Sequence, residues 1–326
     1  MNDNTPVTEA ASAWKRLAER VAAQHWPAPA LYVVATPIGN LGDLGLRAWQ
    51  ALRRCDVIAA EDTRSSRTLL DAWGIGTPLM AAHRHNEAAA AQAVVQRLEA
   101  GERVALISDA GAPAVSDPGA RIVRRVREAG FQVVPVPGAS AVIAALMAGG
   151  VTSDENPAFV FAGFPPPKQG ARRKWLQGWC AIAAPVVLFE SPHRVQATVD
   201  DLLAVCGPGR RLTIARELTK RFEQVETLDL RDAVEWFRGE GHRRQGEFVL
   251  IVHEAEAAGG DEIDAQAVAL LDALLETLSV RDAVKVAAKV SGAPRDALYA
   301  LALERGGGKR DGAKRGARDG RGGADV

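Results

Sequence analysis

The sequence predicts an α/β protein built from two α/β domains followed by a small helical hairpin. From residue 31 onward, short apolar runs alternate with amphipathic stretches, as expected for strands alternating with helices. A polar, turn-rich segment at residues 149–157, GGVTSDENP, interrupts this pattern and indicates a domain boundary. Residues 264–303 have helical periodicity throughout, broken by a Ser-Gly-Ala-Pro turn.

The first domain is expected at residues 31–150, after an N-terminal extension at residues 1–30. The extension contains a short helical pattern and then WPAPA, a sequence that does not continue a helix. Within the first domain, strands and helices largely alternate. Its expected strands are 31–36, 56–61, 103–107 and 132–136, and its expected helices are 44–54, 66–73, 87–100, 120–129 and 139–149.

The second domain is expected at residues 151–256 and has a more mixed order of elements. Its expected strands are 158–162, 185–190, 211–216, 223–229 and 246–253, and its expected helices are 169–181, 194–206 and 230–238. The helical hairpin is assigned to residues 264–305. Such hairpins more often serve packing or dimerisation, and nucleic-acid binding is the alternative. The Gly-rich basic tail, residues 306–326, is expected to be disordered and either binds RNA loosely or keeps the terminus soluble.

Composition limits the classes of function. The 326 residues suffice for two domains with their own cores, and the 40 basic and 40 acidic residues give no net charge that would indicate a polyanionic partner. The three cysteines, Cys55, Cys180 and Cys206, are far apart and form no cluster with metal-ligand spacing. We therefore expect buried thiols, a reducing compartment and no metal site. Because no apolar stretch is long enough to span a bilayer and no signal pattern is present, a cytoplasmic protein without a membrane partner is expected.

The loop LISDAGAPAVSDPG at residues 106–119 is the most informative segment. Its small residues allow a ligand to approach backbone amides, its prolines limit the loop's conformations, and its carboxylates can hold ribose hydroxyls or a cation. The alternative is an ordinary loop in which Asp117 caps the following helix and Pro118 occupies the first helical position. The composition favours a nucleoside-like ligand.

Two further loops follow predicted strands and are also rich in small residues: ATPIGNLGD at residues 35–43 and PVPGASA at residues 135–141. Gly39 and Gly42 do not have the spacing of a dinucleotide fingerprint or a phosphate-binding P-loop, so neither NAD nor ATP is indicated. Open α/β sheets collect ligands at the carboxyl ends of their strands. Three such loops at one edge would form a pocket for a flat, adenosine-like ligand.

Charged residues also stand where apolar strands of the second domain end. LFESPHR places Glu190, His193 and Arg194 there, and ARELTKRFE places Arg216, Glu217 and Lys220. Such charges are costly unless paired or functional, and the structural alternative is an ion pair such as Glu190 with Arg216. EDTR at residues 61–64 and HRHNE at residues 83–87 add polar clusters in the first domain.

Basic residues concentrate in GFPPPKQGARRKW, residues 163–175, which contains four of them and no acid. This segment and the tail are the places where a phosphate backbone is expected to bind. No GxSxG nucleophile elbow or HExxH motif is present. The chemistry is therefore expected to belong to a bound cosubstrate that the protein orients.

Nine motifs in order, TPIGNLGD, AAEDTR, HNE, ISDAGxPxxSDPG, VPVPGASA, GFPPPK, FESPHR, ARELTK and GEFVLIV, closely resemble those of the ribosomal RNA small-subunit methyltransferase I family. The resemblance covers about residues 31–303. It implies the tetrapyrrole methylase fold, with S-adenosylmethionine bound in a cleft between the two domains, homodimerisation, and 2'-O-methylation of a cytidine in the decoding region of 16S rRNA, in free rRNA or in the small ribosomal subunit.

By this resemblance, one set of residues is predicted to bind the cosubstrate: Pro37, Gly39, Asp109, Ala110, Gly111, Ala114, Val115, Ser140, Ala141, Phe189 and Glu190. Two departures from the family pattern stand out. Ala112 occupies a position where threonine is common, which removes one hydroxyl, and the additional prolines in GFPPPK stiffen the segment expected to face RNA.

A ribose 2'-hydroxyl is a poor nucleophile, so methyl transfer requires close positioning and a group that accepts or stabilises the proton. The candidate catalytic residues are Glu190, His193, Glu217 and Lys220, with Lys220 or His193 activating the hydroxyl. Phosphate contacts are expected from Arg64, Lys168, Arg172, Arg173 and Lys174. The alternatives are a methylase of a tetrapyrrole or other small molecule, against which the basic segment argues, and a non-catalytic RNA-binding assembly protein, against which the cosubstrate loops argue.

Overall fold

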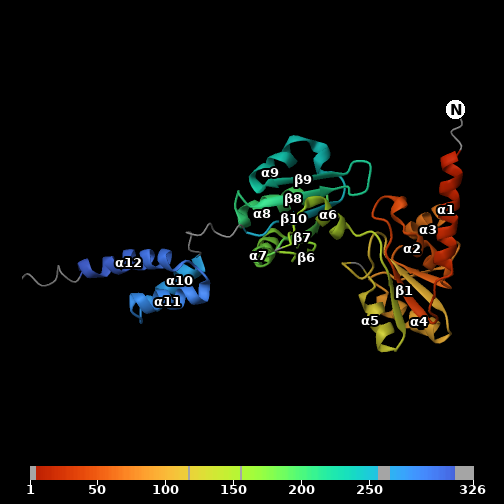
Figure 1. The fold of residues 1–326 in the computed structure, drawn as a ribbon, viewed down its shortest axis with the longest axis horizontal. Coiled ribbons are helices and arrows are strands. Elements are labelled where there is room, and N and C mark those ends of the chain that lie inside the picture. Colours follow the sequence, from red (N-terminus) through yellow and green to blue (C-terminus); the bar gives the residue numbers. More distant parts are fainter. Residues whose placement is uncertain (1–4, 117, 155, 256–264, 313–326) are drawn as a thin grey trace, which may run out of the picture. The chain divides into compact units, whose positions relative to one another are not determined.

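The computed structural model of the chain describes residues 5–116, 118–154, 156–255 and 265–312. It divides into two compact units, Met1–Glu254 and Ala255–Val326 (Figure 1). The larger unit contains both predicted sheets, and the smaller contains the C-terminal helices. The predicted α/β class is confirmed.

The first sheet is entirely parallel and has the strand order β3-β2-β4-β1-β5. Its strands are β1 (Ala30–Val34), β2 (Val57–Ala60), β3 (Leu79–Ala81), β4 (Arg103–Ile107) and β5 (Gln132–Val136). The three-residue edge strand β3 was not predicted, because it is too short for an alternating pattern. Since β1 lies between β4 and β5, the loops that follow these three strands emerge side by side.

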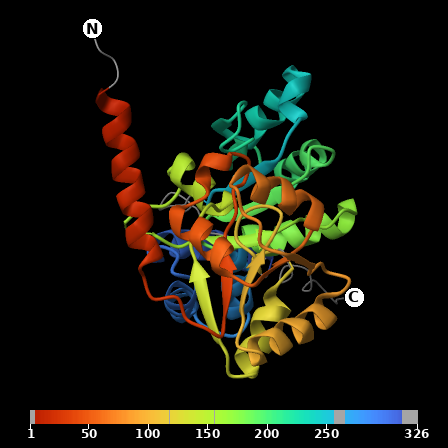
Figure 2. The ribbon, with the colours of Figure 1, turned by 90° about the vertical axis from the view of Figure 1, so that its right-hand side faces the viewer.

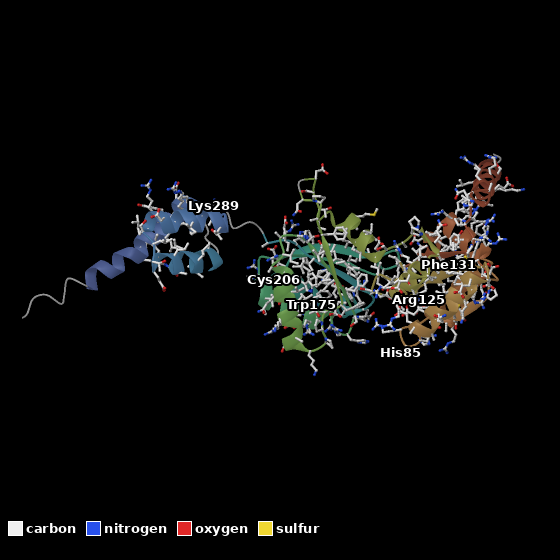
Figure 3. All side chains as sticks on the ribbon, turned by 90° about the horizontal axis from the view of Figure 1, so that it is seen from below. His85, Arg125, Phe131, Trp175, Cys206 and Lys289 are labelled. Atoms are coloured by element: carbon white, nitrogen blue, oxygen red, sulfur yellow. The ribbon has the colours of Figure 1, made fainter. Side chains whose placement is uncertain are left out.

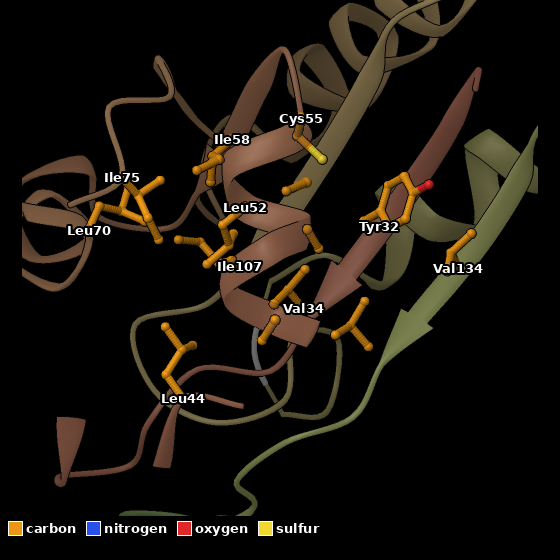
Figure 4. Packing of buried hydrophobic residues seen from close by; sticks show 14 of the residues in the cluster. Tyr32, Val34, Leu44, Leu52, Cys55, Ile58, Leu70, Ile75, Ile107 and Val134 are labelled. Carbon is orange, nitrogen blue, oxygen red and sulfur yellow. The ribbon is translucent and has the colours of Figure 1, made fainter. Parts of the chain in front are cut away.

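Helices cover both faces of this sheet. They are α2 (Leu46–Arg54), α3 (Thr63–Ala72), α4 (Glu87–Glu99) and α5 (Ala120–Glu128), with a short 3-10 helix η1 (Leu41–Asp43) before α2. Alternate strand residues point to opposite faces: Tyr32 and Ile58 pack with Leu52 of α2 (Figure 4), whereas Leu31 and Leu106 pack against α4 and α5. Burial on both faces explains why these strands read as continuous apolar runs.

The N-terminal extension is part of the first domain's core. Helix α1 (Thr5–Ala22) runs along the side of this domain (Figure 2), and Val21 and Trp26 join the apolar cluster around Tyr32. The Tyr32 hydroxyl donates a hydrogen bond of 2.8 Å to the carbonyl of Pro27, and Arg103 donates to the carbonyl of Trp26 at 3.1 Å. The extension thus forms a longer helix than its sequence pattern predicted, and its C-terminal end is anchored to the first domain.

The second sheet is mixed and has the order β6-β7-β10-β8-β9, in which only the β6–β7 pair is parallel. Its strands are β6 (Val160–Gly163), β7 (Val186–Glu190), β8 (Arg211–Arg216), β9 (Gln224–Asp229) and β10 (Phe248–Val252). Helices α7 (Gln169–Cys180), α8 (Val195–Cys206) and α9 (Leu230–Gly239), with the 3-10 helix η2 (Gly241–Arg244), surround an apolar cluster centred on Leu188, Phe237 and Leu250.

The opposite face of the second sheet contacts α6 (Ala141–Gly149) and the first domain's β1 loop. Val142 and Ala145 of α6 share a buried cluster with Val187, Val249 and Ile38. The β1 loop, α6 and the second sheet thus meet in a single apolar layer, on which the candidate site lies.

The C-terminal unit differs from the predicted two-helix hairpin because it contains three described helices, α10 (Ala265–Leu275), α11 (Val280–Ser291) and α12 (Arg295–Gly312). Ala267 and Leu271 of α10 pack with Val284 and Leu298, so the first helix completes a core that two helices would leave exposed. Helix α12 also continues past residue 306, where the disordered tail was predicted to begin; the rest of that tail, 313–326, lies outside the described residues.

The cysteines are placed as expected: Cys55 and Cys180 are buried and Cys206 is partly buried. Burial and the nearby Asp56 raise the pKa of Cys55 to about 12. Among the described helices, none has the length and apolar character that crossing a membrane requires.

Candidate active site

Three loops converge at the carboxyl edge of the first sheet, after β1, β4 and β5. The β1 and β4 loops are joined by a pair of backbone hydrogen bonds between Thr36 and Gly111, with N···O distances of 2.9 and 3.1 Å. The buried Thr36 hydroxyl also donates to the carbonyl of Ser108 at 3.2 Å. These contacts fix the two loops relative to each other.

The small residues of these loops are required by close backbone approach. Gly111 has φ +77°, and a Cβ there would lie 3.3 Å from Ile38 Cγ2. A Cβ on Gly138, in the β5 loop, would lie 3.2 Å from the carbonyl oxygen of Ala35. Ala114 and Ser116 adopt left-handed φ values of 67° and 63°, a conformation that costs non-glycine residues about 1–3 kcal/mol and is concentrated at functional sites.

The loops and the second sheet enclose a cavity of about 440 Å³, within the usual range for small-ligand sites. Seven of the residues predicted to bind the cosubstrate line it: Ala110, Gly111, Val115, Ser140, Ala141, Phe189 and Glu190. Sequence reasoning did not find several other lining residues, among them Ile38, Phe164, Leu218, Glu247 and Val249. All five lie inside the motifs quoted above; four of them are apolar, and Glu247 directly precedes β10.

Four predicted cosubstrate residues are not among those lining the cavity. Asp109 accepts a hydrogen bond of 3.1 Å from the backbone N–H of Asp62, and Ala114 donates to the carbonyl of Pro118 at 3.3 Å. Pro37 belongs to the β1 loop, and Gly39 lies beneath the Lys220 side chain. Asp117, offered as a helix cap, lies outside the described residues. Among the described residues, the carboxylate of Glu87 accepts from the N–H groups of Gly119 and Arg121 at 3.0 Å each, at the start of α5.

One wall of the cavity is aromatic. The ring of Phe189 makes edge contacts with Phe161 and Phe164, with centroid distances of 4.8 and 5.5 Å. Phe164 is 56% exposed, whereas Phe189 is partly buried. The wall offers a flat apolar surface to a ring-containing ligand.

Glu190 is buried and its carboxylate is well satisfied. It accepts from Ser191 N–H at 2.7 Å, from the Thr198 hydroxyl at 2.6 Å and from Arg194 at 3.3 Å. The suggested alternative pairing with Arg216 is wrong: Phe248 of β10 lies between them in register. Arg216 instead donates to the carbonyls of Gln245 and Phe222.

Lys220 forms a cluster with two carboxylates at the cavity. Its ammonium donates to Glu217 at 2.9 Å and to Glu247 at 2.8 Å, and Glu217 also accepts from the N–H of Glu247 at 2.9 Å. Two glycines make room, because a Cβ on Gly39 would lie 2.5 Å from Lys220 Cγ and one on Gly246 would lie 2.5 Å from Glu217 Cδ.

The cluster fixes the charges of its members. Burial alone would lower the pKa of Lys220, but hydrogen bonds and charges from Glu247 and Glu217 outweigh it and raise that pKa. Burial alone would raise the pKa of Glu217, but Lys220 and the Glu247 N–H lower it. Lys220 is therefore a cation at neutral pH, suited to stabilising negative charge and unsuited to accepting a proton.

His193 lies on the exposed segment after β7, next to the cavity-lining Ser191 and Pro192. It is not itself among the lining residues. Of the candidate catalytic residues, the structure thus brings Glu217 and Lys220 together, places Glu190 in a separate satisfied network, and leaves His193 at the rim.

Among the predicted RNA-binding residues, Arg172 requires a correction. It is buried, with its guanidinium bonded to the fully buried Asp201 at 2.6 and 2.7 Å and to the carbonyl of Pro167 at 3.1 Å, so it anchors α7 to α8 and cannot present its charge to RNA. Arg173 also contacts Asp201 at 2.6 Å but remains half exposed. Arg64, whose side chain is 95% exposed, Lys168 and Lys174 face solvent.

Comparison with known proteins decides the family. Residues 30–234 match the model of the tetrapyrrole (corrin/porphyrin) methylases, and residues 261–306 match that of the RsmI C-terminal HTH domain. The ribosomal RNA small subunit methyltransferase I of Neisseria meningitidis serogroup A is 46% identical over 84% of this chain and 92% of its own. The Pseudomonas aeruginosa protein of the same name is 44% identical over 85% and 98%.

The chain belongs to the ribosomal RNA small subunit methyltransferase I family. Solved structures support the fold alone: diphthine synthase superimposes with a TM-score of 0.53 at 15% identity, over 69% of this chain and 90% of its own. The methyltransferase CobJ does so with 0.51 at 19% identity, over 69% and 94%. The predicted tetrapyrrole methylase fold and the predicted family are confirmed.

As a member of this methyltransferase family, the chain uses S-adenosylmethionine as its methyl donor. The cavity fits such a molecule: glycine and alanine backbones line one side, an aromatic wall lines another, and its size suits a nucleoside with a short side chain. Ala112 lies in the lining, at the position where the family commonly has a hydroxyl.

Replacing Asp201 with Asn is predicted to destabilise the larger unit by about 3–5 kcal/mol, because it leaves the buried Arg172 charge without its partner. Chemical unfolding followed by circular dichroism measures the loss. The matched control is Asp200→Asn, one residue earlier and partly exposed, which is expected to cost less than about 1 kcal/mol. Equal losses in the two variants would contradict the structural role of Arg172.

The lowered pKa of Glu217 predicts a pH-dependent contribution to stability. A lowered carboxylate pKa stabilises the fold above its ordinary value of 4.5, and the stabilisation disappears as pH falls through the lowered value. Glu217→Gln is therefore expected to lower the free energy of unfolding by roughly 1 kcal/mol at pH 7 and by less at pH 3, which lies below the ordinary pKa of a glutamate. Urea titrations at both pH values test this, and a loss of the same size at pH 3 would contradict it.

Proposed function

We propose that this protein transfers a methyl group from S-adenosylmethionine to the ribose 2'-hydroxyl of a cytidine in 16S rRNA, in the decoding region of the small ribosomal subunit. The observation that carries the proposal is the cosubstrate-sized cavity, bordered by Lys220 and its two carboxylate partners, in a chain whose relatives, matched over most of their length, are named rRNA small subunit methyltransferases. The substrate is rRNA or the assembled subunit, and the protein acts in the cytoplasm as a homodimer.

The reaction needs a protein group to handle one proton. S-adenosylmethionine supplies an electrophilic methyl on a sulfonium; the 2'-oxygen forms the new C–O bond, the C–S bond breaks, and the hydroxyl proton must leave. We assign Lys220 to the developing negative charge on the 2'-oxygen, because its two carboxylate partners keep it protonated and fixed. In this role Lys220 activates the hydroxyl as a fixed cation and does not accept its proton.

Two groups compete for the proton. Glu247 lines the cavity, is 76% exposed at its side chain, and has one carboxylate oxygen hydrogen-bonded to Lys220. His193, at the rim, is the other residue that the sequence analysis offers for activating the hydroxyl. We favour Glu247 as the proton acceptor because it lines the cavity, whereas His193 does not. Glu190 and Glu217 are assigned to holding the β7 end and Lys220 in place, because their oxygens are engaged by neighbouring donors.

The alternative of a small-molecule methylase keeps some support from the fold. The basic segment, residues 163–175, argues less strongly for RNA over a small-molecule substrate than its sequence suggests, because Arg172 and Arg173 form ion pairs with Asp201. The match of residues 261–306 to an HTH domain and the identity to rRNA methyltransferases favour RNA. The non-catalytic alternative is disfavoured by the intact cavity. We retain four residues as proposed phosphate contacts: Arg64, Lys168, Lys174 and the half-exposed Arg173.

Incubation of the protein with methyl-labelled S-adenosylmethionine and small subunits lacking the modification is expected to produce 2'-O-methylcytidine. Nuclease digestion and mass spectrometry identify the modified nucleoside. Label in another nucleoside would contradict the cytidine assignment, and cosubstrate binding with no transfer to RNA or subunits would favour a small-molecule acceptor.

Lys220→Ala is predicted to lower kcat by about 100-fold or more, since one fixed charge at the reacting oxygen is lost, while cosubstrate affinity changes little. Glu247→Gln is predicted to lower kcat comparably and His193→Ala by only a few-fold. Lys15→Ala on α1 serves as the exposed-lysine control. A large loss of kcat for His193→Ala, together with a near wild-type kcat for Glu247→Gln, would identify His193 and not Glu247 as the proton acceptor.

A further inference from the structure

Helix α5 carries an arginine surface that the proposed chemistry does not use. Its sequence, ARIVRRVRE, holds four arginines and a single acid, in a chain whose basic and acidic residues are equal in number. Ile122 and Val126 are fully buried against the first sheet and α4, so they fix which side of the helix faces inward. Arg121, Arg124, Arg125 and Arg127 are all exposed.

These arginines are poorly neutralised. Within the part of the chain that the structure describes, the only ion pair from α5 joins Arg125 to Glu128, at 3.9 Å. Solvated surface helices usually intersperse opposite charges three or four residues apart, and like charges at that spacing destabilise a helix. The four arginines therefore cost helix stability with Glu128 as the single acid of the helix, which is expected of a surface that meets an anion.

The arginine surface is joined to the active site. Helix α5 begins directly after the β4 loop, whose Gly111 and Val115 line the cavity. Glu87 bonds the first turn of α5 to the start of α4, and the turn before α4 presents the exposed Arg84 and His85 beside it. Figure 3 labels Arg125 and His85 on this part of the first domain. The HRHNE motif is thereby explained: Glu87 builds the junction, Asn86 braces the turn before α4 through hydrogen bonds to His83 N–H and the Ala81 carbonyl, and Arg84 adds a further guanidinium beside α5.

From this we propose that α5 and the turn before α4 bind the phosphate backbone of the RNA strand next to the nucleotide held in the cavity. The proposal rests on the proposed function and names a second RNA contact, separate from the GFPPPK segment. The helix is about 13 Å long, which corresponds to roughly four phosphates of a stacked strand. Arginine suits this partner because its planar guanidinium binds phosphate in a bidentate manner and remains charged.

A hollow at the far end of α5 supports the assignment to a nucleic acid. It is lined by Arg127, Gly130, Phe131 and Val133. Proteins that bind single-stranded RNA commonly place an aromatic side chain beside a cation, so that a base stacks on the ring and a phosphate pairs with the cation. Phe131 is labelled in Figure 3 on the same domain as Arg125.

The test compares three triple variants of the full chain. Arg121, Arg124 and Arg127 are changed together to Gln, or together to Lys; the control changes Arg20, Arg231 and Arg244, which are exposed on α1, α9 and η2, to Gln. Filter binding to unmodified small subunits is measured between 50 and 300 mM KCl, and S-adenosylhomocysteine affinity by calorimetry. The chosen salt range is one in which phosphate contacts change affinity by orders of magnitude.

The glutamine variant of α5 is expected to bind subunits about 10-fold or more weakly at 100 mM KCl and to lose about 2 from the slope of log Kd against log salt. Its S-adenosylhomocysteine affinity should match wild type and its thermal midpoint should equal or exceed wild type, because like charges are removed from the helix. The lysine variant should keep most of the slope. Slopes equal to the control's would overturn the proposal. So would an unchanged slope combined with α5-dependent binding to vesicles of anionic phospholipid.

The two proposals fail differently. Subunit binding that depends on α5, without methyl transfer by the wild-type protein, would support the arginine surface and overturn the proposed function. Methyl transfer to cytidine by the wild type, with unchanged KM and salt slope in the glutamine variant of α5, would overturn the arginine surface alone.

Discussion

The close approach of the β1 and β4 loops is the contact on which the rest of the active site depends. Thr36 and Gly111 exchange two backbone hydrogen bonds, and Gly111 and Gly138 leave no room for side chains at the loop backbones. The parallel strand order, with β1 between β4 and β5, makes this approach possible. The second sheet then closes the cavity with its apolar layer, in which Ile38 of the β1 loop packs beside Val187 and Val249.

Charge is distributed around this cavity in two ways. At its border, Lys220 is held between Glu217 and Glu247, so that a single ammonium is fixed with little freedom. Away from it, the arginines of α5 face solvent with one acidic partner among them. The first arrangement fits charge stabilisation at one atom, and the second fits a chain of phosphates. A neutral net charge is thus compatible with a polyanionic substrate, because the positive charge is local.

Sequence alone anticipated the fold class and nearly all strands, because these depend on local pattern, and the resemblance of its motifs to a known family anticipated seven cavity-lining residues. It missed β3, which is too short for periodicity, and the break at residues 276–279 that divides the predicted helical region into α10 and α11. Arg172 was misjudged because four basic residues and no acid in residues 163–175 predict an exposed basic surface. Only the packing of α7 on α8 shows that Arg172 is paired with the buried Asp201. Glu247 and Phe164 could not be placed without knowing that β10 and the β6 end border the cavity.

Calorimetric titration with S-adenosylhomocysteine of the wild type, of Gly111→Ala and of Gly76→Ala tests the central claim most directly. Gly76 has open space around its backbone, whereas Gly111 has a left-handed φ and lies against Ile38. The account predicts one binding site per chain in the wild type, unchanged affinity in Gly76→Ala, and a loss of about 10-fold or more in Gly111→Ala, equivalent to 1.4 kcal/mol. Wild-type affinity in Gly111→Ala would contradict the claim that the approach of these two loops forms the cosubstrate site.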